Sequence, residues 1–108
     1  MTENPRLRPV EAIPVEQDGR TVIYLKDPLN IASPLGISPV GYFILSHFDG
    51  RHTFIDIQAA FSKRFSQVLL TDDLTNFIET LDRHYYLHSE RFIAYRDSLI
   101  DEFRRRPT

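Results

Sequence analysis

The fold is decided by residues 38–87, which read SPVGYFILSHFDGRHTFIDIQAAFSKRFSQVLLTDDLTNFIETLDRHYYL. This stretch contains three helix-start signals, and each is followed by apolar residues at helical spacing. We therefore expect three short helices in succession, placed after an N-terminal β-hairpin. A small sheet followed by three helices indicates an α+β fold of the winged helix-turn-helix type.

The three helix-start signals use different chemistry. Ser38 supplies a hydroxyl N-cap, and Pro39 follows it at the first helical position, where a missing N–H does no harm. Thr53, with Asp56 three residues later, resembles a capping box with a shortened acid. Thr71 supplies a threonine cap for the third helix, and the two aspartates after it suit the positive end of the helix dipole.

The third helix shows the clearest helical periodicity in the chain. Its apolar residues are spaced at i, i+3, i+4, i+7 and i+11: Leu74, Phe77, Ile78, Leu81 and Tyr85. A fourth helix is predicted from Ser89 to about Arg104, with a stripe consisting of Phe92, Tyr95, Leu99, Ile100 and Phe103. That stripe either packs on the common core or docks another domain or a second copy of the chain, through Phe92, Leu99 and Phe103.

Upstream of these helices, apolar runs flank the tripeptide Gln17-Asp18-Gly19. Asp-Gly between two such runs predicts a β-hairpin, here with a loop of about three residues. The dipeptide Asp27-Pro28 ends the second strand, and at most a short third strand follows at Leu35–Ile37. We expect a flexible leader over residues 1–9, the winged helix-turn-helix domain over 10–88, and a C-terminal helix with a linker stub over 89–108.

Composition excludes several classes of site. The 108 residues contain no cysteine, so disulfides, thiolate metal sites and a cysteine nucleophile are absent. The formal net charge of −2 provides no general attraction to phosphate backbones or anionic lipids. The N-terminus lacks the apolar stretch of a signal peptide, and no long apolar run predicts a membrane span. We expect a cytoplasmic protein with no membrane partner.

The charge of the third helix bears on DNA binding. In a helix-turn-helix, this helix enters the major groove and faces the phosphates. Residues 72–86 instead carry four acidic residues against one arginine: Asp72, Asp73, Glu79, Asp82 and Arg83. Because phosphate neutralisation supplies most of the non-specific affinity for DNA, we expect no nucleic acid partner. A DNA-binding regulator is the alternative function for this fold. The acidic face is either solvated or binds a partner.

No set of residues predicts catalysis or a cofactor. His84 and His88 have a spacing that suits zinc on one helical face, but no third ligand is evident, so we expect no metal. The sequence offers no Ser/His/Asp combination and no glycine-rich phosphate loop. We therefore expect a segment that is not an enzyme and binds no cofactor.

The apolar skeleton around the hairpin and the three helices resembles the pyrroloquinoline-quinone biosynthesis protein D (PqqD-like) group. That group includes the recognition elements of enzymes that modify ribosomal peptides (RiPP recognition elements). The resemblance covers about Val10 to Leu87. It rests on the loop Asn30–Ser38, on Phe43-Ile44-Leu45 before Asp49-Gly50, on Asp56-Ile57, and on Leu74, Phe77 and Leu81.

A second resemblance covers nearly the whole chain. The residues look like the N-terminal part of Memo-like proteins called AmmeMemoRadiSam system protein B, which are associated with a radical-SAM protein. It rests on residues 6–10 (RLRPV), 25–28 (LKDP), 56–61 (DIQAAF) and 89–92 (SERF). No Memo domain is present in these residues, so none of its chemistry is carried over.

The first resemblance implies a mechanism without catalysis. In such recognition elements an extended peptide adds to the edge of the three-stranded sheet and lies beside the third helix. Mapped onto this sequence, the edge is formed by Leu35, Gly36 and Ile37, and the helical wall is formed by Thr75, Ile78, Glu79 and Asp82. The acidic wall favours a peptide that carries Lys or Arg. The expected partner is a peptide or protein, such as a radical-SAM protein or its substrate.

Overall fold

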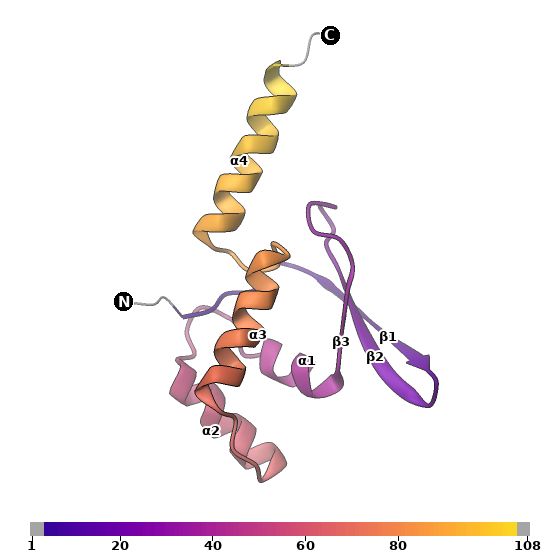
Figure 1. Cartoon of the computed structure of the whole chain (residues 1–108), viewed down its shortest axis with the longest axis vertical. Coiled ribbons are helices and arrows are strands. Elements are labelled where there is room, and N and C mark those ends of the chain that lie inside the picture. Colours follow the sequence, from indigo (N-terminus) through magenta and orange to yellow (C-terminus); the bar gives the residue numbers. More distant parts are fainter. Residues whose placement is uncertain (1–3, 106–108) are drawn as a thin grey trace.

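The computed structural model describes residues 4–105, which form a three-stranded sheet followed by four helices (Figure 1). This order confirms the α+β fold class, while the finer winged helix-turn-helix arrangement stays a prediction. The elements are β1 (Glu11–Gln17), β2 (Arg20–Lys26), β3 (Leu35–Ile37), α1 (Pro39–Leu45), α2 (Phe54–Phe65), α3 (Thr71–Arg83) and α4 (Glu90–Arg105).

The sheet is antiparallel with the order β1-β2-β3, and its hairpin is tighter than expected. Gln17 pairs with Arg20, so the turn consists of two residues rather than about three. Asp18 and Gly19 have φ angles of 51° and 75°. Positive φ at both positions is the geometry of a type I′ turn, whose twist matches that of the paired strands.

The expected caps of α1 and α2 are confirmed. The Ser38 hydroxyl accepts a hydrogen bond from the Gly41 N–H at 3.0 Å. Thr53 and Asp56 form a reciprocal capping box, in which each side chain accepts the other residue's N–H at 3.1 and 3.0 Å. These local bonds satisfy N–H groups that have no partner inside the helix.

The start of α3 differs from the expected threonine cap. Leu70 occupies the N-cap position, and no side chain caps the helix there. The Thr71 hydroxyl instead accepts a hydrogen bond from the Gln58 side-chain amide of α2 at 3.1 Å. A contact between two helices has therefore replaced the local cap.

Helix α4 begins as expected, because the Ser89 hydroxyl accepts the N–H of Phe92 at 3.3 Å. From this start α4 extends away from the other elements (Figure 1). Its outer half therefore shares little surface with the sheet and the other three helices.

Residues 4–8 pack against the domain, within the segment 1–9 that was expected to be a flexible leader. Arg6 forms an isolated β-bridge with Asp49, and Leu7 forms one with Leu87. The Leu7 side chain also packs against the core. Residues 1–3 lie outside the described part of the chain. The leader looked flexible because it is polar, but its backbone pairs with segments far away in the sequence.

The core gathers residues from β2, from α1–α3 and from the loops that join them. Its fully buried members come from elements separated widely in sequence, so the sheet and the helices close over one another. The buried core residues are Leu25, Ala32, Ile44, Leu45, Phe48, Ile57, Phe61, Leu69, Leu74, Leu81, Tyr86 and Leu87.

A buried ion pair crosses this core. Arg8 and Asp27 are 4% and 1% exposed, and one guanidinium nitrogen of Arg8 donates to both carboxylate oxygens of Asp27, at 3.1 and 3.0 Å. The other terminal nitrogen of Arg8 donates to the Tyr85 carbonyl at 2.5 Å. The guanidinium also lies 3.9 Å from the centre of the Phe92 ring of α4.

Asp27 also shapes the loop between β2 and β3. Its carboxylate accepts backbone N–H groups from Leu29, Ile31 and Ala32 at 2.9, 3.0 and 2.9 Å. The buried hydroxyl of Tyr86 donates to the Ser33 carbonyl at 2.5 Å in the same loop. Asp27, which the sequence marked only as part of the end of a strand, therefore anchors this loop.

These contacts set the ionisation of Asp27. Burial raises the pKa of the carboxyl, but hydrogen bonds from the N–H groups of Ala32 and Leu29 and from Arg8 lower it more. The pKa of Asp27 therefore lies below its ordinary value of 3.8. Burial together with the Asp27 charge raises the pKa of Tyr86, so its hydroxyl keeps its proton.

We expect Arg8→Met to lower the free energy of unfolding by about 3–5 kcal/mol, because it leaves the Asp27 carboxylate buried without its cation. Urea unfolding followed by circular dichroism measures this change. The exposed Arg20→Met in β2 is the matched control and should change the free energy by less than about 0.5 kcal/mol. Equal midpoints for the two variants would contradict the role of the ion pair.

A second prediction concerns pH. Because the folded-state pKa of Asp27 is lowered, its stabilisation is fully present above the unfolded value of 3.8 and is lost as pH falls through the folded value. The difference in unfolding free energy between the parent chain and Asp27→Asn should be constant between about pH 7 and 5 and shrink below about pH 4. Urea titrations across this range test it, and a difference that grows on acidification would refute it.

Candidate functional site

Strand β3 is an edge strand. It pairs with β2 alone, through Leu25 with Leu35, Tyr24 with Gly36, and Ile23 with Ile37. The outer edge of β3 pairs with no other strand within residues 4–105. Its side chains Leu35 and Ile37 pack against the core, so the strand is anchored while its outer edge pairs with no other strand within residues 4–105.

Gly36 of β3 lies close to two side chains of β2. A Cβ atom at this position would lie 3.1 Å from side-chain carbons of both Tyr24 and Val22, which is closer than ordinary contact. Glycine at this position therefore lets the β2 side chains cover β3, and its role is local packing in the sheet.

The four residues expected to form the helical wall line one cavity of about 670 Å³ beside α3. The opposite side of this cavity is formed by the N-terminal segment, the first residue of α2 and the start of α4. Its lining consists of Asn4, Pro5, Arg6, Phe54, Thr75, Ile78, Glu79, Asp82, Leu87, His88, Ser89, Glu90 and Arg91.

The structure therefore separates the predicted site residues into two sets. Thr75, Ile78, Glu79 and Asp82 share the cavity, and no residue of β3 lines it. A neighbouring face of α3 is turned to α1, because a Cβ atom on Gly41 would lie 3.5 Å from the Phe77 ring. The acidic side of α3 thus faces the N-terminal segment, and α1 follows directly after β3 on the other side.

The charges in the cavity are partly paired. Asp82 accepts a short hydrogen bond from the Ser89 hydroxyl and lies 3.6 Å from the Arg91 side chain. Glu79, one turn earlier on α3, makes no hydrogen bond or ion pair with other described residues. Asp82 is therefore a structural link between α3 and α4, while Glu79 is open to solvent or to a ligand.

The histidines lie at separate places in the fold. Helix α3 ends at Arg83, so His84 and His88 do not share a helical face, and Tyr85 between them has a φ of 65°. Across residues 4–105, no three His, Cys, Asp or Glu residues gather closely enough to hold a metal ion. The exposed His52 bonds to Asp49 and, with the Arg51 N–H, holds the pKa of that carboxyl well below its usual range.

The residues considered for a dimer contact are not equivalent. Phe92 is only 4% exposed and lies under the Arg8 guanidinium, so it packs within its own chain. Leu99 is half-buried, and Phe103 is 77% exposed near the end of α4. Only the outer half of the α4 stripe is therefore open for a contact with another molecule.

Comparison with known proteins finds a similarity to one curated protein. No protein-family model matches the chain, and no solved structure matches it. A MEMO1 family protein from Aquifex aeolicus (strain VF5) is 33% identical to it over 69 residues. Over these residues the chain is therefore similar to a MEMO1 family protein. They make up 64% of this chain and 18% of the relative, so the chain spans less than a fifth of that protein.

This similarity agrees with the Memo-like resemblance seen in the sequence. It gives no support to the PqqD-like resemblance, which stays a prediction. Because most of the relative lies outside the match, the activity of the whole relative is not transferred to this chain. None of the helices within residues 4–105 combines the length and apolar character that crossing a bilayer requires.

The contact between α3 and α4 supports a specific prediction. Ser89→Ala removes both the bond to Asp82 and the cap on the Phe92 N–H, so we expect a loss of about 1 kcal/mol in the free energy of unfolding. The control is Ser98→Ala, an exposed position inside α4, where alanine should be neutral or slightly stabilising. Thermal or urea unfolding that shows no difference between the two variants would rule out this role.

Proposed function

We propose that the chain is a non-catalytic recognition module that binds an extended peptide or protein segment by adding it as a fourth strand beside β3. The observation that carries the proposal is the open outer edge of β3, which pairs only with β2 among the described strands. An open edge offers unpaired backbone donors and acceptors to an incoming strand, which is the basis of β-strand addition.

The anchoring of β3 supports this proposal. Leu35 and Ile37 pack against the core, and the loop that leads into β3 is held by three backbone hydrogen bonds to Asp27. An edge that is already ordered binds a peptide with a smaller entropic loss than a mobile edge. The peptide then gains main-chain hydrogen bonds without ordering the domain.

The proposal places backbone recognition at β3 and does not require Thr75, Ile78, Glu79 or Asp82, which line a cavity on another side of α3. For the partner, we propose a radical-SAM protein or its substrate. The similarity to a MEMO1 family protein agrees with the resemblance to the AmmeMemoRadiSam proteins. The link to a radical-SAM protein comes from that resemblance alone.

Selection of binders from a peptide library tests the function with probes that do not depend on the identity of the partner. A phage library of random peptides of about ten residues is panned on the whole chain, and the selected peptides are titrated into ¹⁵N-labelled protein. We expect the largest amide shifts at 35–37 and at the β2 residues opposite them. Shifts confined to other elements would overturn the placement at β3.

Backbone methylation of a selected peptide is the matched control. N-methyl groups on alternate residues remove the donors along one edge of the strand and leave every side chain in place. Two such peptides are possible, with the methyl groups on the odd or on the even residues. One of them should lose binding and the other should bind almost as before, because only one edge of the added strand pairs with β3. Equal binding by both methylated peptides would show that no strand is added.

A further inference from the structure

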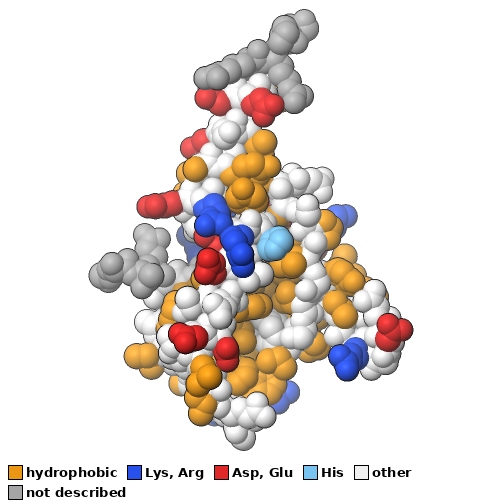
Figure 2. Space-filling model, in the orientation of Figure 1, with side chains coloured by type: hydrophobic (Ala, Val, Ile, Leu, Met, Phe, Trp, Pro, Cys, Tyr) orange, Lys and Arg blue, Asp and Glu red, His pale blue; other side chains and the backbone are white. Residues whose placement is uncertain are grey.

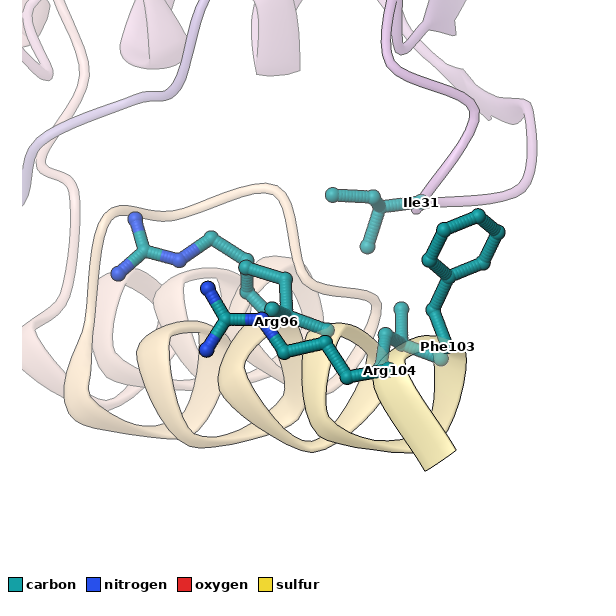
Figure 3. A pocket seen from close by; sticks show the side chains of 6 residues that line it. Ile31, Arg96, Phe103 and Arg104 are labelled. Atoms are coloured by element: carbon teal, nitrogen blue, oxygen red, sulfur yellow. The ribbon is translucent and has the colours of Figure 1, made fainter. Parts of the chain in front are cut away.

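The outer half of α4 carries an apolar surface that the rest of the chain covers only in part. Leu99, Ile100 and Phe103 lie on this side of the helix, and Ile31 of the β2–β3 loop approaches them. Together they line a cavity of about 280 Å³, and Figure 3 shows Ile31 and Phe103 on facing sides of it. An exposed apolar surface of this kind is typical of a contact with another molecule.

Two arginines give this surface a positive charge. Arg96 and Arg104 line the same cavity, and Figure 3 shows both guanidinium groups pointing the same way, away from Phe103. Arg96 also contacts the neighbouring Asp97 at 3.3 Å, in an exposed pair that contributes little. We call these two arginines, with Leu99, Ile100, Phe103 and Ile31, the α4 patch.

The loop between α2 and α3 presents the complementary chemistry. Val68 is 77% exposed, Leu70 is also exposed, and both are large apolar residues on the surface. Asp72 and Asp73 follow in the first turn of α3, exposed and without a hydrogen bond or ion pair to other described residues. We call these four residues the loop segment.

We propose that the α4 patch of one copy of this chain binds the loop segment of a second copy. Val68 and Leu70 would cover the apolar half of the patch, and the two aspartates would face Arg96 and Arg104. Both surfaces place an apolar group next to a charge, and the charges are opposite in sign. This match of apolar area and charge is the argument for a second copy rather than an unrelated partner.

The shape of the chain lets this contact close on itself. The α2–α3 loop and the tip of α4 lie at opposite ends of the longest axis, which spans 57 Å (Figure 1). Hydrophobic side chains gather over α4 and again towards the opposite end of the same face (Figure 2). Two copies lying antiparallel, face to face, would therefore make the contact twice and form a two-fold dimer without open ends.

Charge-reversal variants test the proposal with the full chain. Sedimentation equilibrium of the parent chain should show a dimer. The double variants R96E/R104E and D72R/D73R should each raise the dissociation constant of the dimer by at least about tenfold. A mixture of the two variants should restore dimers, because in the heterodimer one contact has its charges exchanged and the other has the parent charges.

The outcomes separate the proposal from its competitors. A contact between two α4 helices predicts that D72R/D73R has no effect, and this result would overturn the proposal. A parent chain that stays monomeric up to about 1 mM would also overturn it, as would a mixture that fails to form dimers. Circular dichroism of each variant first confirms that the fold is intact.

A pair of apolar substitutions provides a second, charge-independent test. Val68→Ser in the loop segment should weaken the dimer, whereas Ile55→Ser on α2 should not, although the two side chains are similarly exposed at 77% and 76%. Because both positions face solvent in the monomer, neither change should unfold it. Equal dissociation constants for these two variants would exclude the loop segment from the interface.

Discussion

The buried ion pair between Arg8 and Asp27 is the interaction on which the rest of the structure depends. It joins the N-terminal segment to the end of β2, and the same guanidinium reaches the Tyr85 carbonyl after α3 and the Phe92 ring of α4. Removing two charges from water is costly, so such a pair is retained only when its hydrogen bonds are nearly complete. No buried side-chain polar atom in residues 4–105 lacks a partner.

This pair also fixes the candidate binding edge. The Asp27 carboxylate collects three backbone N–H groups of the loop that leads to β3, and Tyr86 holds the Ser33 carbonyl of the same loop. The direction in which β3 leaves the loop is therefore set by a charge network rather than by the short strand itself. A recognition edge built in this way is ordered before any ligand arrives, which reduces the entropic loss on binding.

Helix α3 shows how one element can serve several neighbours. Its apolar side contributes Leu74 and Leu81 to the core, Phe77 faces α1, and its acidic side lines the cavity next to the N-terminal segment. The periodicity of the sequence predicted the apolar side correctly. It could not say which neighbour the acidic side would meet, because that depends on where residues 4–8 and the start of α4 pack.

The sequence by itself determined the α+β elements, the position of the hairpin turn though not its length, and the caps at Ser38, Thr53 and Ser89, because these signals act between residues a few positions apart. Only the tertiary structure decided three further points: the burial of Arg8 against Asp27, the separation of the β3 residues from the α3 cavity, and the burial of Phe92. Each of these depends on contacts between segments that are distant in sequence. A polar residue such as Arg8 looks the same in a local pattern whether it is solvated or paired inside the core.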